Sequence, residues 1–278
     1  MSVQLQLLRL LLVFVVFPVS TALVCTESNL QRLAQAASLS YLPLNKMKSS
    51  PYFKSLGWEP IHQVVDPVSE SGATIFNNND HTWVIACRGS ANPKNFGTNL
   101  QFQLVPATDL SQNDLPPQAM VHQGFRQAAL GLWRQLGPVL LQLIPENEAD
   151  VVFTGHSLGS ATALLCAVHF QASVPWQQHQ SIITFGGPKL CNGPLARHLR
   201  HVALEGWDIL HLVHDKDPVL ANNQKLWQRL GMENVGIEMS CDPQAPKVYT
   251  EARRKSGPAW NILDHCQYMG VFVGPRMV

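Results

Sequence analysis

The sequence DVVFTGHSLGSATALL, residues 150–165, joins an apolar β-type run directly to an Ala- and Leu-rich helical run, with a serine at the bend. Gly155 and Gly159 flank Ser157 in the spacing G-x-S-x-G, and glycines there remove the Cβ atoms that would clash in so sharp a turn. A serine hydroxyl is a good nucleophile only where the backbone presents it to solvent and a base reaches it. The stretch therefore predicts Ser157 as a nucleophile at the end of a strand. The alternative is a serine that only caps the following helix.

The start of that helix also suits negative charge. Backbone N–H groups of its first turn and the helix dipole would stabilise an oxyanion that forms beside Ser157. His156 precedes the nucleophile in sequence, but adjacent side chains on such a turn point apart. We therefore interpret His156 as structural and look for the base elsewhere in the chain.

Apolar and β-branched runs alternate with helical patterns, which predicts an α/β fold with a mostly parallel central sheet covered by helices on both faces. ATIF (73–76) and TWVIAC (82–87), separated by a turn signal, predict an antiparallel pair. Further strands are predicted at VVFT, SIITF and DILHLV. Residues 124–144 predict an amphipathic helix that Gly137-Pro138 would kink or start anew, whereas residues 221–260 are polar and irregular.

The composition fits one large core, with 278 residues of which 46% are hydrophobic and 14% charged. No linker, repeat or charge run divides the chain, so we expect residues 23–278 to form a single domain. The formal net charge of +1 gives no long-range field that would attract nucleic acid or an anionic membrane. Any partner must therefore be recognised at a local site.

The N-terminal residues have the pattern of a targeting segment. Arg9 precedes an uncharged run over residues 10–26 that includes Pro18 and the small residues Ser20-Thr21-Ala22. The strongly apolar part, residues 10–17, is shorter than the roughly 20 residues that span a bilayer. We expect residues 1–22 to be a cleaved secretory signal and the protein to be secreted or in the lumen of the secretory pathway. The alternative is an uncleaved anchor that tethers the protein to a membrane.

Six cysteines allow fifteen pairings, so the sequence does not assign disulfides. Cys87 and Cys166 lie in strand-like and helix-like apolar runs, where a cysteine serves as a small buried residue. Bridges are expected among Cys25, Cys241 and Cys266. No cysteine has metal-ligand spacing, so no metal site is expected.

The order of residues along the chain narrows the partners of Ser157. In strand–turn–helix elbows of this type, the acid and then the histidine follow the serine. His265 is the histidine that follows the candidate acids, and it is the predicted general base. Asp215 and Asp217 both follow the strand DILHLV, at the sheet edge where such folds keep functional residues. The pattern leaves these two aspartates as alternatives for the acid.

Six blocks of the sequence together resemble the class 3 lipases, the fungal-lipase-like branch of the α/β hydrolases. In order they are ACRGSANPKNFGTNLQFQL, VHQGF, GHSLGSATA, TFGGPKL, HDKDPV and LDHCQY. The resemblance implies an α/β-hydrolase fold with Ser157 as nucleophile, Asp217 as acid and His265 as base. It also implies an oxyanion hole from the backbone N–H groups of Ser90 and Leu158, with the Ser90 hydroxyl as an extra donor, and no cofactor.

The resemblance further implies a lid over residues 91–99, with Phe96 as its large apolar residue. The expected activity is hydrolysis of lipid esters, as in a triacylglycerol lipase, through an acyl-enzyme at a lipid–water interface and without a stable protein partner. A phospholipase A1 and a short-chain or feruloyl-type esterase would use the same triad and differ in the groove. The alternative of another class is a catalytically silent binding protein on the hydrolase fold.

Overall fold

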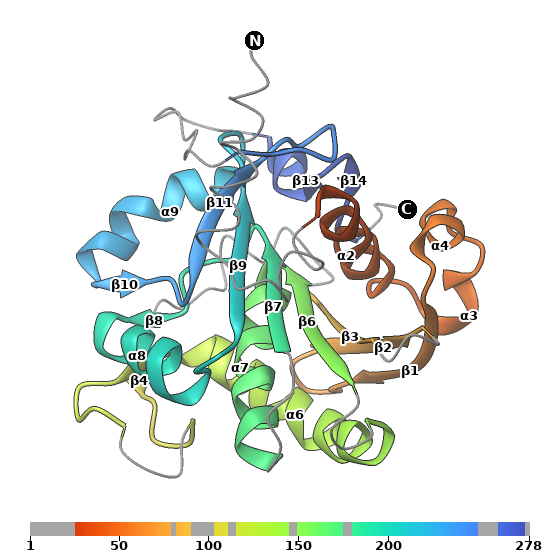
Figure 1. Cartoon of the computed structure of the whole chain (residues 1–278). Helices are drawn as coiled ribbons and strands as arrows, with labels where there is room; N and C mark the ends of the chain where they lie inside the picture. The colour runs from red at the N-terminus through yellow and green to blue at the C-terminus, as the bar shows by residue number, and fades with distance from the viewer. Residues whose placement is uncertain are drawn as a thin grey trace, which may run out of the picture.

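A computed structural model describes residues 26–78, 82–89, 103–110, 115–144, 149–174, 180–249 and 261–275. Its centre is an eight-stranded sheet in the order β1-β2-β3-β6-β7-β9-β11-β12 (Figure 1). The strands are β1 (Glu59–Val65), β2 (Gly72–Asn77), β3 (Thr82–Arg88), β6 (Asp150–His156), β7 (Gln180–Phe185), β9 (Asp208–Val213), β11 (Ile237–Cys241) and β12 (Val248–Tyr249).

The middle of this sheet is parallel and its ends are antiparallel. Neighbouring strands from β3 to β11 run parallel, whereas β1, β2 and β3 pair antiparallel, as do β11 and β12. The antiparallel pair and the strands that the sequence predicts are therefore confirmed. Parallel neighbours bring their carboxyl ends to one edge, so the segments after β3, β6, β7 and β9 meet there.

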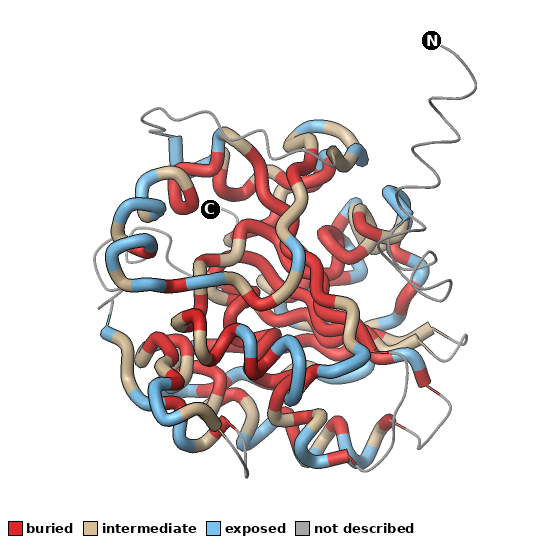
Figure 2. Tube along the Cα trace, turned by 60° about the vertical axis from the view of Figure 1, so that its left-hand side comes forward, coloured by how far each residue is buried: buried red, intermediate tan, exposed pale blue. Residues whose placement is uncertain are grey.

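Alternate residues of the strands face two separate apolar cores. On β3, β6 and β7, Ile85, Phe153 and Ile182 belong to the core on the side of α6 and α7. Val84, Val152 and Ile183 belong to the core on the side of α2 (Figure 1). The buried residues follow the strands through the middle of the molecule, and exposed residues lie on the outer helices (Figure 2). The prediction of helices on both faces is confirmed.

The helices in the described segments include long helices that cover the sheet and short helical turns in the connections. They are α2 (Glu27–Leu39), α3 (Leu44–Met47), α4 (Pro51–Leu56), α6 (Gln123–Leu143), α7 (Leu158–Ser173), α8 (Gly193–His198) with the π turn η1 (Leu199–Ala203), α9 (Pro218–Arg229) and the 3₁₀ turn η2 (Ile262–Cys266).

Helix α6 corrects one expectation. It runs unbroken through Pro138, so the predicted fresh start at Gly137-Pro138 is wrong. Pro138 and Arg134 lie on the exposed side of the helix, where the Arg134 carbonyl that loses its helical donor can bond to water. Gly137 lies against the Trp133 ring, and a Cβ at this glycine would approach the indole to 2.8 Å.

Helix α9 is a second difference, because the sequence reading gave residues 221–260 no regular structure. Asp217 caps the helix and Pro218 occupies its first position, a combination that marks a helix start and that the sequence reading missed. Short strands β4 (Leu104–Pro106), β5 (Met120–His122), β8 (Cys191–Asn192) and β10 (Met232–Glu233) form a second, antiparallel sheet, and β13 (Gln267–Tyr268) pairs with β14 (Val271–Phe272).

The five cysteines in the described segments are all buried free thiols: Cys87, Cys166, Cys191, Cys241 and Cys266. Of the bridges expected among Cys25, Cys241 and Cys266, the pairing of Cys241 with Cys266 is therefore wrong, and Cys25 lies outside the described residues. Burial raises the pKa of Cys241 to about 12 and that of Cys266 to about 11. Both thiols are thus small buried residues, the role predicted for Cys87 and Cys166.

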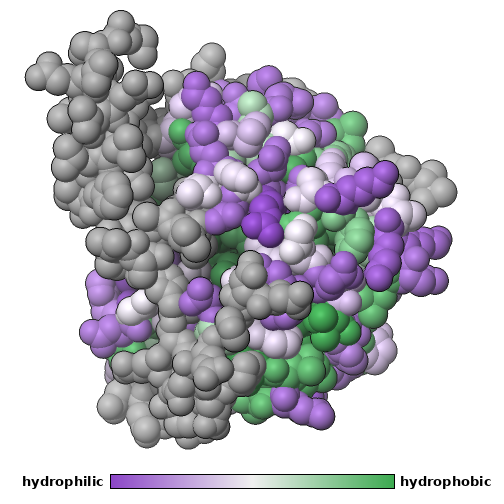
Figure 3. Space-filling model, turned by 45° about the vertical axis from the view of Figure 1, so that its right-hand side comes forward, coloured by the Kyte–Doolittle hydropathy of each residue, from purple (hydrophilic) through white to green (hydrophobic). Residues whose placement is uncertain are grey.

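The surface on the side of β1, α3 and α4 is mostly hydrophilic, with hydrophobic patches between the polar side chains (Figure 3). Within the described segments, no helix is long and apolar enough to cross a membrane. The predicted signal segment, residues 1–22, lies outside the described residues.

Candidate active site

Ser157 occupies a sharp bend between β6 and α7. Its backbone angles are φ 60° and ψ −127°, a combination that residues other than glycine seldom adopt. The Ser157 N–H donates to the carbonyl of Phe185 at the end of β7, at 3.0 Å. The neighbouring strand therefore holds the bend in this strained conformation, which is typical of a nucleophile elbow, with Ser157 itself only 5% exposed.

The two flanking glycines are required by backbone packing. A Cβ at Gly155 would lie 2.3 Å from the carbonyl oxygen of Gly159, and a Cβ at Gly159 would lie 2.3 Å from that of Cys87. The Ser160 hydroxyl, within 3.0–3.1 Å of the Gly155 and Phe185 carbonyls, braces the same turn. The steric reason expected for the two glycines of G-x-S-x-G is confirmed.

Asp217 lies in the loop after β9 and is completely buried. One carboxylate oxygen, Oδ1, accepts the backbone N–H groups of Val219 and Leu220 at 2.9 and 3.2 Å, because Asp217 is the N-cap of α9. The other, Oδ2, faces His265 Nδ1 at 2.8 Å and accepts a hydrogen bond from the Tyr268 hydroxyl. Every side of this carboxylate is therefore bonded.

These hydrogen bonds determine whether the Asp217 carboxyl group is ionised. Burial alone would raise the pKa of Asp217, but the adjacent His265 and the Tyr268 hydroxyl outweigh burial and hold the pKa below its ordinary value. Burial and the neighbouring carboxylate raise the pKa of Tyr268 well above its ordinary value, so this hydroxyl stays a donor. Asp217 is thus an anion that can orient an imidazole and stabilise its protonated form.

His265 is carried by the turn η2, and only 5% of its surface is exposed. Because Nδ1 donates to Asp217, Nε2 is the ring nitrogen that can take a proton from a serine. The ring lies beside that of His156, with centroids 4.7 Å apart. The structure thus brings His265 to the residue next to Ser157, and it places Asp217, not Asp215, against His265.

Leu158, the predicted oxyanion donor, is the first residue of α7. Ser90 and the predicted lid, residues 91–99, lie outside the described residues. Their neighbour Gly89 comes close to the elbow, since a Cβ there would lie 3.3 Å from Ser157 Cβ and 2.7 Å from the His156 carbonyl. The residue that follows β3 therefore packs against Ser157.

The sequence reading missed three residues around this site. Tyr268 bonds Asp217, Tyr41 bonds His156 Nδ1 at 3.1 Å, and His214 bonds the backbone beside His265. Tyr268 and His214 lie within the LDHCQY and HDKDPV blocks, so their sequence neighbourhood was a usable signal. Tyr41 had no such signal, because it lies in a separate N-terminal segment.

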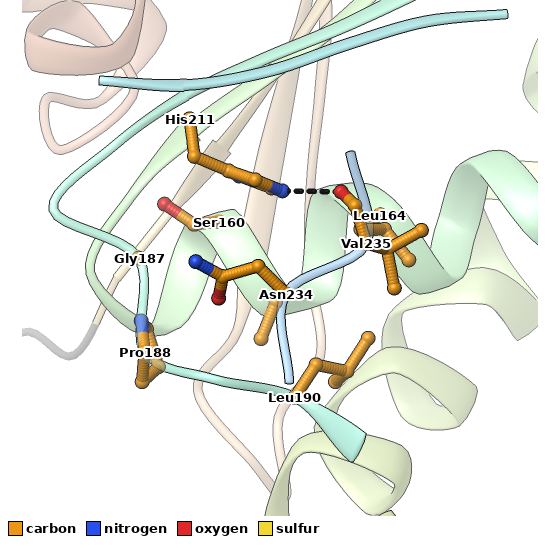
Figure 4. A pocket seen from close by; sticks show the side chains of 9 residues that line it. Ser160, Leu164, Gly187, Pro188, Leu190, His211, Asn234 and Val235 are labelled. Carbon is orange, nitrogen blue, oxygen red and sulfur yellow. Dashed lines mark hydrogen bonds between the residues drawn. The ribbon is translucent and has the colours of Figure 1, made fainter. Parts of the chain in front are cut away.

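A small cavity lies beside the first turns of α7, lined by Ser160, Leu164, Gly187 and His211 among others (Figure 4). It has room for about one water molecule, so it cannot hold an acyl chain. Among the described residues, no group of histidine, cysteine and acidic side chains has the arrangement of a metal site.

The family model Lipase (class 3) matches residues 84–222, which is half of the chain. The chain belongs to the class 3 lipase family. The family segment includes Ser157 and Asp217, whereas His265 lies beyond it.

Two curated relatives illustrate the range of the family. "Lipase" of Rhizopus niveus is 28% identical over 169 residues, which cover 56% of this chain and 41% of the relative. "Phospholipase A(1) DAD1, chloroplastic" of Arabidopsis thaliana is 28% identical over 120 residues, which cover 40% and 26% of the two chains. The matches thus span less than half the length of these relatives.

Solved structures of lipases superimpose on most of the chain. The native Rhizomucor miehei lipase propeptide complex gives a TM-score of 0.70 at 23% identity, over 88% of this chain and 80% of that one. Lipase II from Rhizopus niveus gives 0.72 at 21% identity, over 90% and 96%. A triacylglycerol lipase, described as having a serine-protease triad as its catalytic centre, gives 0.69 at 22% identity, over 88% and 95%. The protein has the α/β-hydrolase fold.

Proposed function

We propose that the protein hydrolyses lipid esters, as a triacylglycerol lipase does, with Ser157 as nucleophile, His265 as base and Asp217 as acid. The observation that carries this proposal is the buried Asp217–His265 pair, which lies against the strained elbow of Ser157. Membership of the class 3 lipase family and the serine-protease triad described for a triacylglycerol lipase of the same fold support it.

The reaction has two acyl-transfer steps. His265 Nε2 takes the Ser157 proton, and Ser157 Oγ attacks the ester carbonyl. Asp217 holds the ring and stabilises the imidazolium, which then gives its proton to the leaving alcohol. Water activated by the same histidine releases the fatty acid. The oxyanion of each tetrahedral intermediate would be bonded by the N–H groups of Leu158 and Ser90, with the Ser90 hydroxyl as an extra donor.

The surroundings of the base favour an apolar substrate. Ile262 and Leu263, each 41% exposed, stand on the turn that carries His265, where an acyl chain or a lipid surface could contact them. The net charge of +1 gives no general attraction to anionic lipids, so apolar contact must provide most of the affinity. From the resemblance to the class 3 lipases we also propose that residues 91–99, with Phe96, act as a lid.

The second candidate is a phospholipase A1. The Arabidopsis relative of that name supports it, and the catalytic steps would be the same. The two activities differ in whether the groove accepts a charged headgroup beside the ester.

The test is hydrolysis of a short soluble ester, an emulsified long-chain triacylglycerol and a phospholipid by wild type, Ser157→Ala and Ser173→Ala. Ser173 lies at the exposed end of α7 and bonds the His169 carbonyl, so its variant controls for a serine lost from the same helix. We expect Ser157→Ala to lose at least about 10³-fold in kcat and Ser173→Ala to keep full activity.

The substrate profile decides between the candidates. Preference for the triacylglycerol emulsion supports the lipase, and preference for phospholipid supports the phospholipase. Activity confined to the soluble ester would point to a short-chain or feruloyl-type esterase. Equal, negligible rates from wild type and Ser157→Ala would refute catalysis and favour a silent binding protein.

We also propose secretion as a single domain, residues 23–278, after removal of residues 1–22. The positively charged start, the short apolar run and the small residues before position 23 support this processing. Mass spectrometry of the N-terminus of the expressed protein tests it. A mature chain that keeps residues 1–22 would instead support the membrane-tethered alternative.

A further inference from the structure

The turn η2 carries the proposed base, yet it is a short 3₁₀ turn at the end of the sheet. Small displacements of such a turn would move His265 away from both Ser157 and Asp217. A side chain that reacts must be held within a fraction of an ångström of its productive position. The question is which bonds, other than those of the triad itself, fix η2.

Two histidine side chains hydrogen-bond to the backbone carbonyls of consecutive residues in this turn. His156 Nε2 lies 2.7 Å from the carbonyl oxygen of His265 itself. His214 Nε2 lies 2.7 Å from the carbonyl oxygen of Asp264. The Asp264 carbonyl also accepts the backbone N–H of Gln267, and a carbonyl oxygen has a second lone pair that can accept from a histidine. We refer to these two hydrogen bonds as the histidine clamp.

The bond to a carbonyl fixes the tautomer of each clamp histidine, and the second ring nitrogen has a partner that fits it. A carbonyl only accepts, so Nε2 carries the proton in both rings and Nδ1 must accept. His156 Nδ1 lies 3.1 Å from the Tyr41 hydroxyl, and His214 Nδ1 accepts the backbone N–H of Lys216 at 3.2 Å. Tyr41 in turn accepts the N–H of Gly89, at the end of β3, at 2.9 Å. Each ring is therefore held on both sides.

Burial keeps both rings neutral, as this pattern requires. Both side chains are 2% exposed. Burial, reinforced by the nearby His265, lowers the pKa of His156 to about 3. Burial also lowers the pKa of His214, although Asp217 opposes this effect. A neutral ring with a proton on Nε2 is a donor to one side and an acceptor to the other.

The clamp joins the three segments that hold the triad. His156 precedes the nucleophile Ser157, and His214 stands three residues before the acid Asp217. Both bind the segment of the base. The segments of nucleophile and acid are thus tied to that of the base through backbone carbonyls, independently of the bonds that the triad side chains make with each other.

We propose that His156 and His214 are positioning residues that hold the turn η2 and so set the place of His265 for proton transfer. The proposal rests on the proposed function of the triad. It concerns residues that touch no substrate, so loss of the clamp should lower kcat and leave KM nearly unchanged.

The experiment uses paired substitutions at His214. In His214→Gln the amide nitrogen can take the place of Nε2 and keep the bond to Asp264. In His214→Asn the shorter amide can keep the bond at Nδ1 but cannot reach Asp264. Values of kcat and KM are measured on a short soluble ester, per active site titrated with a phosphonate, together with the thermal unfolding midpoint.

His211 provides a matched control. It lies on β9, is buried, and makes the same two kinds of bond, both at 2.6 Å. Its Nε2 bonds to the Val235 carbonyl (Figure 4), and its Nδ1 bonds to the Thr184 hydroxyl. The carbonyl that it binds belongs to a segment without a triad residue. His211→Asn should therefore lower the unfolding midpoint without changing kcat per titrated site.

We expect His214→Asn to lose about 10- to 100-fold in kcat with KM within about twofold, and His214→Gln to recover most of the loss. The proposal is overturned if His214→Asn keeps the wild-type kcat, if Gln is as slow as Asn, or if His211→Asn loses as much. Where His214→Asn does not fold, His156→Asn against His156→Gln is judged by the same three criteria. Wild-type protein without Ser157-dependent hydrolysis would instead refute the proposed function.

Discussion

Tyr268→Phe tests how the buried carboxylate of Asp217 is held. The substitution removes one hydroxyl that donates to Asp217 Oδ2 and keeps the ring, which packs at 5.8, 6.0 and 4.8 Å between centroids against His156, Phe185 and His214. Phenylalanine therefore leaves the apolar contacts in place and isolates the hydrogen bond.

The expected magnitude follows from burial and charge. A hydrogen bond to a charged group contributes about 1.5–3 kcal/mol, and Asp217 is completely buried, so water cannot replace the lost donor. For a chain of this size, each kcal/mol shifts the unfolding midpoint by about 2–4 °C, so a decrease of roughly 3–12 °C is expected. Hydrolysis should fall less than about tenfold, because the bond from His265 to Asp217 remains.

The pH dependence of this loss has a defined sign. Burial opposes ionisation of Asp217, but His265 and Tyr268 together hold its pKa in the folded state below the ordinary value. The carboxylate then stabilises the fold above the unfolded pKa of about 3.9, and this stability disappears as the pH falls through the folded pKa. The difference between wild type and Tyr268→Phe should be full at pH 7 and shrink below about pH 4.

Urea and thermal unfolding of both proteins at pH 7 and pH 3.5 measure the effect. Tyr249→Phe is the matched control, because the Tyr249 hydroxyl also donates to a carboxylate, Asp242 Oδ2 at 3.2 Å, but in a partly exposed position. Tyr249→Phe should lower the free energy of unfolding by less than about 1 kcal/mol. Equal losses from the two variants, or a loss from Tyr268→Phe that is the same at both pH values, would refute the reasoning.

Gly159→Ala places a Cβ 2.3 Å from a backbone oxygen of β3, so it should abolish most hydrolysis and lower the free energy of unfolding by about 1–3 kcal/mol. The control Gly124→Ala has its nearest atom at 3.4 Å and should be tolerated in the same activity and unfolding assays. Because the pKa of His156 is lowered to about 3, the unfolded state binds one more proton between about pH 6.5 and 3, so the free energy of unfolding should decrease as the pH falls through that window. His156→Gln should reduce this slope by up to about 1.4 kcal/mol per pH unit in urea titrations; an unchanged slope would contradict the assignment. The buried thiols Cys241 and Cys266 should react with iodoacetamide at pH 8 only after unfolding, and labelling of the native protein, read by peptide mass spectrometry, would show that they are accessible.

Expectations that depend on residues close in sequence agree with the structure. The strand, the elbow and the helix of residues 150–165 form as expected, since steric rules for glycine and the periods of strand and helix act over a few residues. Local rules failed where the surroundings changed their effect. Pro138 is accommodated inside α6 because its side of the helix faces solvent. The start of α9 is a different case, because local rules could have identified its Asp217 cap.

The choice between Asp215 and Asp217 shows where sequence reasoning stops. Both residues follow β9, and the residues alone left them as alternatives. Asp217 is fully buried between His265, Tyr268 and the start of α9, whereas Asp215 is partly exposed. The family resemblance favours Asp217, and the packing of these three elements around one carboxylate gives the physical distinction between the two.

The sequence by itself determined the α/β class, the position of the elbow and the candidate residues Ser157 and His265. These follow from local sterics and from the order of residues along the chain. The tertiary structure placed Asp217, which the family resemblance also implied, against His265, and it brought Tyr41 and His214 to the site from segments far apart in sequence. The physical reason is that parallel strands end at one edge of the sheet. Which side chains meet there depends on strand order and helix packing, which involve residues too far apart for a sequence pattern to encode.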